Sequence, residues 1–369
     1  MASIRKRKLP SGKIVWQCDF KDAMGKRRSR QFEKKREADS FMVKARAEIS
    51  SGTYVHDADS TTVKEATQVW LDSCAQRRDK GLEMEAATYV AYEVHVRVHI
   101  LDPEVGIGGI KLSRLTRKAA NDFRDRLLES GRSEAMTRKV LTTLKLILAL
   151  ALDNQEIAFN PAERVKVRRA SRIREEITIP SKADVKRLID AASEDFRPLL
   201  VVSVFCGLRA SETRGLRWCD VDFEKGYLHV RQRADRYNQI GEPKSKAGRR
   251  SVPMGPFVTN SLKAWRLRSP KGPLDLVFPT KRGTVQSHEN VLNRRFKPLC
   301  KKLGIERFRW HNLRHFAVSL WIEQAFSVKA IQTFAGHGSV QMTMDLYGHL
   351  FPSPDHHVGM GEVERRLLG

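Results

Sequence analysis

A polar, basic stretch bounded by prolines divides this chain of 369 residues into two apolar regions. It covers residues 159–180, where Asn160 and Pro161 precede the run KVRRASRIREE and Pro180 closes it. Such a composition is typical of an interdomain linker rather than of a packed element. Since domains usually contain about 100–200 residues, two or three domains are expected.

The charge of the chain indicates an acidic partner. There are 68 Lys and Arg against 43 Asp and Glu, a formal net charge of +25, which favours nucleic acid over a merely soluble basic protein or a membrane-surface binder. No run of about 18 apolar residues predicts a membrane span, and no apolar stretch follows the basic start as in a signal peptide. Five scattered cysteines argue against a disulfide framework or a cysteine zinc site. We expect a protein of the reducing cytoplasm, in contact with DNA.

Residues 1–58 predict a small sheet with a helix, and they are strongly basic. Strands are expected over 13–20 and 26–32, with a turn at 22–25 and a helix after them. A sheet and a helix rich in arginine can present cations to DNA, although a solvated face is the ordinary alternative. The candidate DNA contacts here are Arg27, Arg28, Arg30, Lys34 and Lys35, to which the linker adds Arg168 and Arg169.

The apolar spacing over residues 60–158 predicts a helical domain. Thr62 is expected to cap a helix that carries Val63, Ala66 and Trp70 at intervals near 3.6 residues. Further helices are predicted near 85–100, 117–130 and 134–153.

Residues 181–355 predict a third, mixed domain, so the whole chain is expected to be mainly α with small β elements, an α+β fold. Tail residues 356–369 could dock in cis or on a neighbouring copy. Three short strands are predicted at 218–223, 226–233 and 249–254. Helices are predicted near 256–267, 288–303, 310–324, 327–335 and 339–347.

Four segments of this third domain carry residues suited to phosphodiester chemistry. Two arginines from separate segments could clamp the non-bridging oxygens of one phosphate, and a lysine could protonate the leaving 5′ oxygen. A tyrosine could attack the phosphorus, provided that a cationic site activates it. The segments are GLRASE with Arg209 and Glu212, EPKSKAGRRSVP with Lys244, WHNLRH with His311 and Arg314, and FAGHGSVQMTMDLYGHL with His337 and Tyr347.

Supporting roles follow from the same spacing. Glu212 lies three residues after Arg209 and is expected to hold a basic group or the fold, because a carboxylate would repel phosphate. Gly336 permits close approach, and His337 is expected to open a helix and donate to a phosphate oxygen. His311 and His315 have a spacing that can bind zinc, but no third ligand is evident, so His315 is expected to pack or to lie beside the phosphate.

The order and spacing of these motifs resemble the tyrosine recombinase, or phage integrase, family. The resemblance implies that Arg209, His311 and Arg314 activate the scissile phosphate, that His337 assists, and that Tyr347 is the nucleophile. Lys244 resembles the family's hairpin lysine, and Lys246 remains an alternative. It also implies arm-binding and core-binding domains ahead of the catalytic one, double-stranded DNA with core and arm sites, a homotetramer, accessory DNA-bending proteins, and neither metal nor other cofactor.

Two other functions share parts of this pattern. A type IB-like topoisomerase would use much of the same catalytic set to relax supercoils alone, whereas the basic N-terminal region and the tail favour a recombinase. A non-catalytic DNA-binding regulator on the same fold is the third hypothesis, and the complete set of site residues argues against it.

Overall fold

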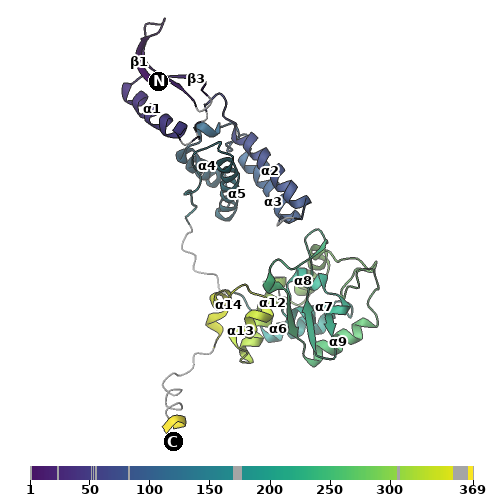
Figure 1. The fold of residues 1–369 in the computed structure, drawn as a ribbon. Helices are drawn as coiled ribbons and strands as arrows, with labels where there is room; N and C mark the ends of the chain where they lie inside the picture. The colour runs from purple at the N-terminus through teal and green to yellow at the C-terminus, as the bar shows by residue number, and fades with distance from the viewer. Residues whose placement is uncertain are drawn as a thin grey trace. The chain divides into compact units, whose positions relative to one another are not determined.

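The computed structural model separates into two compact units, Met1–Ile173 and Arg174–Gly369 (Figure 1). Helices dominate both and the sheets are small, as the sequence predicts. The strands of these sheets pair antiparallel. No helix in the described part of the chain is long and apolar enough to cross a membrane. The structure describes residues 2–22, 25–50, 52, 54, 56–81, 84–168, 177–305, 308–351 and 365–368.

The first unit begins with a three-stranded sheet in the order β1-β2-β3. One face packs against α1, where Cys18 and Phe20 of the sheet meet Ala38 and Met42 of the helix in a small apolar cluster. We call this part the N-terminal module. Its elements are β1 (Ser3–Lys8), β2 (Ile14–Lys21), β3 (Arg27–Phe32) and α1 (Lys35–Ser50).

Strands β2 and β3 confirm the two predicted strands, whereas the sequence does not predict β1. The six residues of β1 read SIRKRK and show no apolar alternation. Its backbone pairs with β2 from Ser3 opposite Asp19 to Lys8 opposite Ile14. Tertiary pairing, rather than local propensity, therefore makes this segment a strand.

A helical domain completes the first unit. Its first helix, α2 (Val63–Asp79), starts at the predicted cap: the Thr62 hydroxyl accepts from the Glu65 amide at 3.2 Å, and Glu65 accepts from the Thr62 amide at 2.7 Å. The other elements are α3 (Ala86–His95), a π-helical turn (Val96–Ile100), a 3-10 turn (Leu112–Arg114), α4 (Arg117–Glu129) and α5 (Glu134–Asp153).

The core of this domain lies between the apolar faces of its helices. Phe123 and Leu127 of α4 and Leu144 and Leu148 of α5 are fully buried. Each such side chain contributes about 1.5–3 kcal/mol relative to exposure. This packing holds the helices of the domain together.

The predicted linker begins at residue 159, but the chain after α5 still packs on the helical domain beyond that residue. Ala162 and Val165 are buried in the domain's core, and the Asn160 amide donates to the Lys145 carbonyl at 2.9 Å. Arg168 is exposed, and Arg169 lies outside the described residues. Ile177 and Ile179 pack against the core of the second unit, so only the middle of the predicted stretch is left to connect the units.

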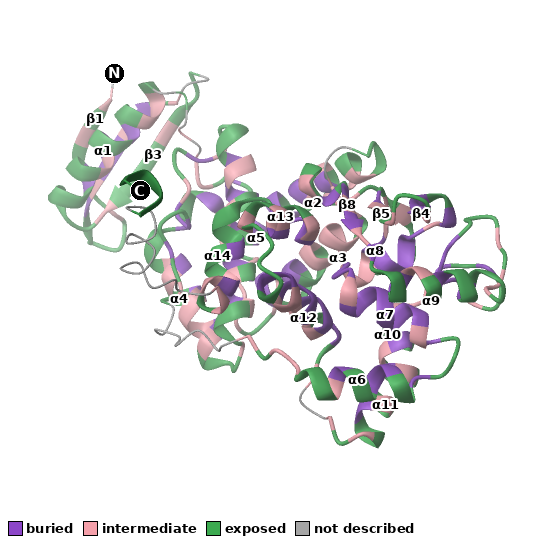
Figure 2. Ribbon diagram, turned by 90° about the horizontal axis from the view of Figure 1, so that it is seen from below, coloured by how far each residue is buried: buried purple, intermediate pink, exposed green. Residues whose placement is uncertain are grey.

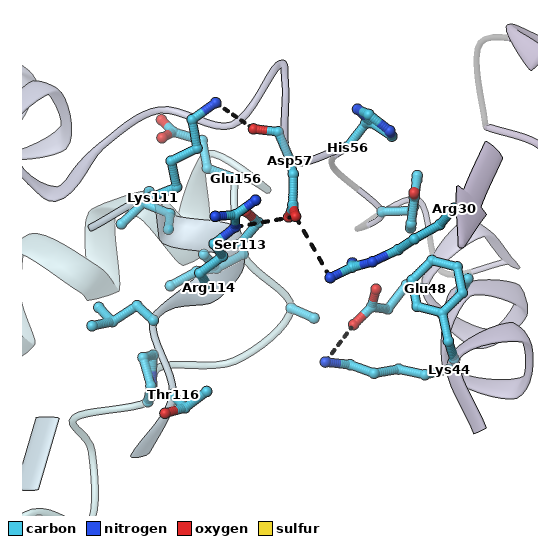
Figure 3. A pocket seen from close by; sticks show the side chains of 18 of the residues that line it. Arg30, Lys44, Glu48, His56, Asp57, Lys111, Ser113, Arg114, Thr116 and Glu156 are labelled. Carbon is cyan, nitrogen blue, oxygen red and sulfur yellow. Dashed lines mark hydrogen bonds and ion pairs between the residues drawn. The ribbon is translucent and has the colours of Figure 1, made fainter. Parts of the chain in front are cut away.

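A hollow of about 980 Å³ lies within the first unit, between the N-terminal module and the helical domain (Figure 3). Asp57 projects into it and forms ion pairs with Arg30 at 3.7 Å and Arg114 at 3.2 Å. Burial opposes ionisation of Asp57, but hydrogen bonds from Ser113 and Arg114 and the charge of Arg30 lower its pKa. The carboxylate thus ties the two parts of the unit together.

The second unit packs its helices around α7 (Arg197–Phe205), which is buried along its length (Figure 2). The predicted helices of this region are present, although the one near 288–303 contains a π-helical turn at Leu292–Phe296. The other helices are α6 (Lys182–Ala191), α8 (Ala210–Gly215), α9 (Pro256–Arg266), α10 (His288–Val291), α11 (Lys297–Lys302), α12 (Trp310–Glu323), α13 (Val328–Ala335) and α14 (Val340–Tyr347).

The β region of this unit differs from its prediction in detail. The strand expected over 218–223 begins with a 3-10 turn at Trp218–Asp220, because buried Asp220 accepts hydrogen bonds from Arg217 and Arg231. The strand expected over 226–233 divides into β5 and β6, which belong to separate sheets. The strands are β4 (Val221–Asp222), β5 (Tyr227–Val230), β6 (Arg233–Ala234), β7 (Ile240–Gly241) and β8 (Arg250–Pro253).

Most of the predicted tail, 356–369, falls outside the described residues, so its docking stays a prediction.

Candidate active site

Arg209 stands immediately before α8 and reaches the turn after α13. Its Nη1 donates to Glu212 Oε1 at 2.7 Å, and its Nη2 donates to the Gly336 carbonyl at 2.7 Å. The side chain remains 37% exposed, so part of the guanidinium is open to a ligand. The contact with Gly336 joins two motifs that lie 127 residues apart.

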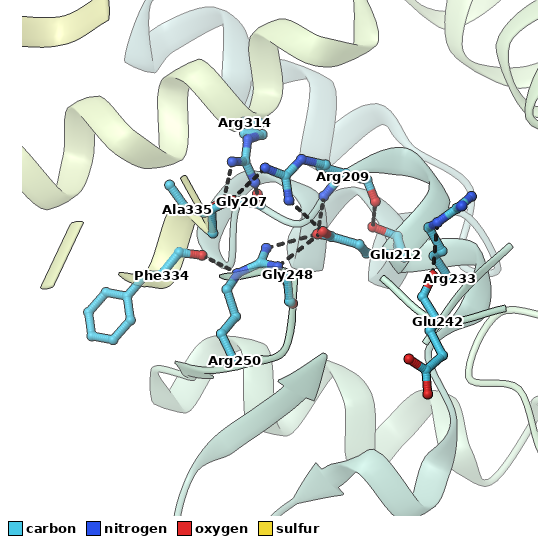
Figure 4. A network of polar contacts seen from close by, with 12 residues as sticks. Gly207, Arg209, Glu212, Arg233, Glu242, Gly248, Arg250, Arg314, Phe334 and Ala335 are labelled. Atoms are coloured by element: carbon cyan, nitrogen blue, oxygen red, sulfur yellow. Dashed lines mark hydrogen bonds and ion pairs between the residues drawn. The ribbon is translucent and has the colours of Figure 1, made fainter. Parts of the chain in front are cut away.

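Glu212 is a buried carboxylate held between two arginines (Figure 4). Arg250 of β8 donates to Glu212 Oε1 at 3.0 Å and to Oε2 at 2.8 Å. Burial alone would raise the pKa of Glu212, but the hydrogen bonds and charges of Arg250 and Arg209 outweigh it and lower the pKa to about 2. Glu212 therefore orients Arg209, as the sequence suggested for a residue supporting the site.

Arg250 is a residue that the sequence motifs missed. Its side chain is 1% exposed, and it also donates to the Phe334 carbonyl at 2.6 Å and the Gly248 carbonyl at 3.0 Å. It thereby joins β8, α8 and α13 at one point. The alternation of β8 could have revealed it, because Arg250 shares the inward face of the strand with buried Val252.

Arg314 of α12 is the second arginine of the predicted clamp and is 4% exposed. It donates to the Gly207 carbonyl at 2.7 Å and to the Ala335 carbonyl (Figure 4). Burial and the nearby cations of Arg209 and Arg250 lower its pKa to about 9, which still leaves it charged at neutral pH. The two predicted arginines thus contact adjacent carbonyls, those of Ala335 and Gly336.

Gly336 ends α13 in the left-handed conformation, with φ of 63°. A Cβ there would lie 2.9 Å from Arg250 Nη1 and 3.0 Å from the Ala247 carbonyl, so the expected close approach is made to the arginine network. His337 follows in the turn instead of opening a helix, because α14 starts only after its cap, Ser339.

His337 is buried beside the arginines, and its Nδ1 lies 2.9 Å from Thr343 Oγ1. Burial and the cations of Arg314, Arg209 and Arg250 lower its pKa to about 4. The ring is therefore neutral at pH 7, with one nitrogen held by Thr343 and the other left for a ligand.

Tyr347 ends α14 and is only 1% exposed. Its ring stacks on His337 with centroids 6.2 Å apart, and its hydroxyl lies 2.6 Å from Nδ1 of His315. Burial raises the pKa of Tyr347 to about 12, against the opposing charge of Arg314. His315 thus contacts the predicted nucleophile directly, a role that its spacing on the helix did not reveal.

His311 is exposed on α12, one turn before His315. The two rings meet edge to face with centroids 4.7 Å apart. Burial of the ring and the cations of Arg314 and Arg209 lower the pKa of His311. No cluster of metal-ligating side chains is present among the described residues.

Lys244 and Lys246 lie between β7 and β8, and both are exposed. Their segment is anchored at the site, because Arg250 contacts the Gly248 carbonyl and the Ala247 carbonyl lies near Gly336. The choice between the two lysines as proton donor therefore stays open.

The second unit matches the model of the phage integrase family over residues 181–353. Its match spans all the site residues described above. The second unit is a tyrosine recombinase domain of the phage integrase family. We call it the catalytic unit.

The resemblance to known recombinases extends beyond this unit. A XerC-like tyrosine recombinase of Caldanaerobacter subterraneus is 25% identical over 325 residues, 80% of this chain and 81% of the relative. The ICEBs1 integrase of Bacillus subtilis is 27% identical over 66% of this chain and 69% of that protein. The lambda integrase in a tetramer bound to a Holliday junction shares the fold, with a TM-score of 0.59, 16% identity, and coverage of 95% of this chain and 96% of that one. The chain is thus a DNA-cleaving and rejoining enzyme.

The predicted DNA contacts of the recombinase's N-terminal module fall into two groups. Arg28 is 12% exposed and forms ion pairs with Asp22 at 2.7 Å and with Asp59. These two carboxylates neutralise its charge. Arg30 pairs with Asp57 and also contacts the Phe41 ring at 5.0 Å. Arg27, Lys34 and Lys35 are exposed, as is Arg30 despite its contacts.

The register of the sheet places Arg27 on the face away from α1. Cys18 and Phe20 pack beneath α1, and their register partners are Arg30 and Arg28. Side chains alternate along a strand, so Arg27 points to the other face. Arg5 and Arg7 of β1 share that face, which we call the open sheet face.

Proposed function

We propose that the chain is a site-specific integrase that cleaves DNA through Tyr347 and leaves a 3′-phosphotyrosyl link. The observation that carries this proposal is the convergence at the turn after α13. Arg209 contacts the Gly336 carbonyl, Arg314 contacts the Ala335 carbonyl, and His337 comes next in the chain. Tyr347 stacks on His337, so the nucleophile and the phosphate donors belong to one site.

In this mechanism the phosphate binds where donors are already fixed. Arg209 and Arg314 donate to its non-bridging oxygens, with His311 and His337 assisting, so little reorganisation is needed as negative charge develops. Tyr347 Oη bonds to phosphorus while the bond to the 5′ oxygen breaks. Lys244, or Lys246, protonates that oxygen. The phosphotyrosyl bond conserves the energy of the cut linkage, so rejoining needs no added cofactor.

The partner of this chemistry is double-stranded DNA. We infer that the helical domain and the catalytic unit bind the core site and that the N-terminal module binds arm-type sites. Four protomers would exchange strands between two duplexes through a Holliday junction, with accessory DNA-bending proteins. Exposed Arg168, with Arg169 beyond the described residues, would contact the backbone between the domains. The chain would act on the bacterial nucleoid in the cytoplasm, integrating or excising a prophage or mobile element.

A nicked suicide substrate tests the chemistry directly. The enzyme, incubated without metal, should accumulate a covalent 3′-phosphotyrosyl adduct, and Tyr347→Phe should form none. An adduct that survives this substitution would overturn the assignment of the nucleophile. Relaxation of plasmids that lack a target site, at the same protein concentration, would instead favour a topoisomerase.

A further inference from the structure

His315 contacts the hydroxyl of Tyr347, the proposed nucleophile, but it has no role in the proposed mechanism so far. Its Nδ1 lies 2.6 Å from Tyr347 Oη. On α12 it follows Arg314 directly and stands one turn after His311, whose ring packs edge to face against it. His315 therefore lies between a predicted phosphate ligand and the predicted nucleophile.

The charges around His315 set the direction of this hydrogen bond. Burial, His311 and Arg314 lower the pKa of His315 to about 4, so the imidazole is neutral at pH 7. The pKa of Tyr347, about 12, leaves the phenol protonated. A neutral phenol has one proton to donate, and an unprotonated Nδ1 can accept it. We therefore assign the tautomer with the proton on Nε2.

The neighbouring histidine is placed less well for that proton. The contact between His337 and Tyr347 is a ring stack, with an interplanar angle of 9° and centroids 6.2 Å apart. The Nδ1 of His337 is also occupied by Thr343 Oγ1 at 2.9 Å. His315 is thus the histidine whose lone pair is directed at the phenolic proton.

We propose that His315 accepts the proton of Tyr347 during cleavage and returns it during rejoining. The proposal rests on Tyr347 being the nucleophile. As the bond from Tyr347 Oη to phosphorus forms and the bond to the 5′ oxygen breaks, the phenolic proton moves to His315 Nδ1. The 5′ oxygen gains its proton from Lys244 or Lys246. In reverse, the 5′ hydroxyl attacks phosphorus and returns its proton to the same lysine, while His315 reprotonates the departing phenolate.

The bound phosphate makes this transfer favourable in a site that otherwise repels cations. Burial, and then the charges of His311 and Arg314, oppose a positive imidazole at His315 in the free enzyme. A phosphodiester held by the arginines adds a negative charge beside them. Proton acceptance is therefore coupled to substrate binding, because an opposite charge nearby favours the charged form.

The first experiment measures single-turnover cleavage of the suicide substrate by the full-length chain. His315→Phe keeps an aromatic ring but removes the acceptor, and the adduct should form about 10²–10⁴ times more slowly, the range for general acid–base catalysis. Binding of the uncleaved DNA should be unchanged. His288→Phe is the matched control, since His288 is also a half-buried ring that packs edge to face, on Trp310, and it has no part in the proposed mechanism. It should cleave like the natural enzyme.

A second variant covers the case in which Phe disturbs the fold. His315→Asn retains a hydrogen-bond acceptor near the Nδ1 position but cannot take up a proton, so it should also be slow. A full cleavage rate with Asn would overturn proton acceptance. Unchanged or faster cleavage with Phe, in a folded and DNA-binding protein, would overturn it as well.

A substrate with sulfur in place of the bridging 5′ oxygen separates the two proton transfers. Thiolate leaves without a proton, so this substrate should restore cleavage by a variant that lacks the proton-donating lysine, Lys244→Ala or Lys246→Ala. His315→Phe should still cleave this substrate slowly. If the sulfur substrate restored its cleavage rate, His315 would instead be the residue that protonates the leaving 5′ oxygen. An adduct in Tyr347→Phe would reject the proposed function itself, whichever result His315 gives.

Discussion

The arginines of the catalytic unit and those of the N-terminal module are held in opposite ways. Arg314 and Arg250 are almost fully buried and donate to fixed carbonyls or to a carboxylate. Arg27 is exposed on the open sheet face. A clamp on one reacting phosphate requires donors set in advance, whereas a surface that follows a DNA backbone can use solvated, adaptable cations. The difference is what the proposed roles require, a catalytic role for the first set and a DNA-binding role for the second.

Arg28 is the instructive exception to this comparison. It belongs to the N-terminal module, yet it is enclosed between Asp22 and Asp59 like an arginine of the catalytic unit. The run KRRSR therefore mixes a structural arginine with binding candidates, and charge density alone does not distinguish them.

The largest expected effect is on stability, and it compares Arg250, the first residue of β8, with Arg249, which precedes the strand. Arg250→Met should lower the free energy of unfolding by about 3–5 kcal/mol, because Glu212 would remain as a buried charge without its main partner. Arg249→Met breaks only the exposed pair with Glu242 and should cost about 0–1 kcal/mol. Denaturant unfolding of both variants measures the difference, and equal losses would show that the Glu212 network does not stabilise the unit.

The next largest effect is on the rate of cleavage. It compares an arginine-to-lysine substitution in the catalytic unit with one in the N-terminal module. Arg314→Lys keeps the charge but removes the fixed fork of donors, so cleavage of the suicide substrate should fall by about 10²–10³-fold. Arg27→Lys should leave cleavage and arm-site affinity within about twofold, because a solvated cation suffices there. A full cleavage rate in the Arg314→Lys variant would contradict the idea of preset donors.

The pH dependence of stability gives a third contrast. The pKa of Glu212 is about 2 in the folded state, below its ordinary value of 4.5, so its contribution is present above pH 4.5 and is lost as pH falls toward 2. The loss should be about 3 kcal/mol across that window. Acid unfolding should therefore be less steep in Glu212→Gln than in the natural chain.

Glu33 of the N-terminal module is the control for this measurement. A hydrogen bond from Lys13 and its charge lower the pKa of Glu33, but both side chains are exposed and screened by solvent. Glu33→Gln should therefore leave the acid unfolding curve close to that of the natural chain. A change as large as that of Glu212→Gln would remove the contrast between buried and exposed pairs.

The smallest effect concerns the open sheet face. Replacing Arg5 and Arg27 with Ala should weaken arm-site binding and reduce the slope of log affinity against log salt by about 1 for each DNA phosphate that is no longer neutralised. Cleavage of an isolated core site should not change. Filter binding over a salt series measures the slope, and an equal loss of affinity for both DNAs would count against a separate arm module.

Much of the catalytic unit follows from local sequence signals. Four motifs identify Arg209, Arg314, His337 and Tyr347, and the structure brings these four together at one turn. The helical domain is also predictable from local sequence, since Thr62 caps α2 as the sequence pattern predicts. Segments without local periodicity were less predictable: β1 is a strand because β2 pairs with it, and the turn at Trp218–Asp220 depends on hydrogen bonds from Arg217 and Arg231.

The motifs alone identify the chemistry of this protein, because each reacting group needs a particular residue type and its motif is short. Which residues hold the reacting groups in place depends on contacts between distant segments. Arg250 meets Glu212 across 38 residues, and His315 meets Tyr347 across 32. Each contact joins two different elements, β8 to α8 and α12 to α14, so no local pattern encodes it. Burial at the place where the segments meet then lowers the pKa of His315 and leaves it neutral beside Tyr347, the proposed nucleophile.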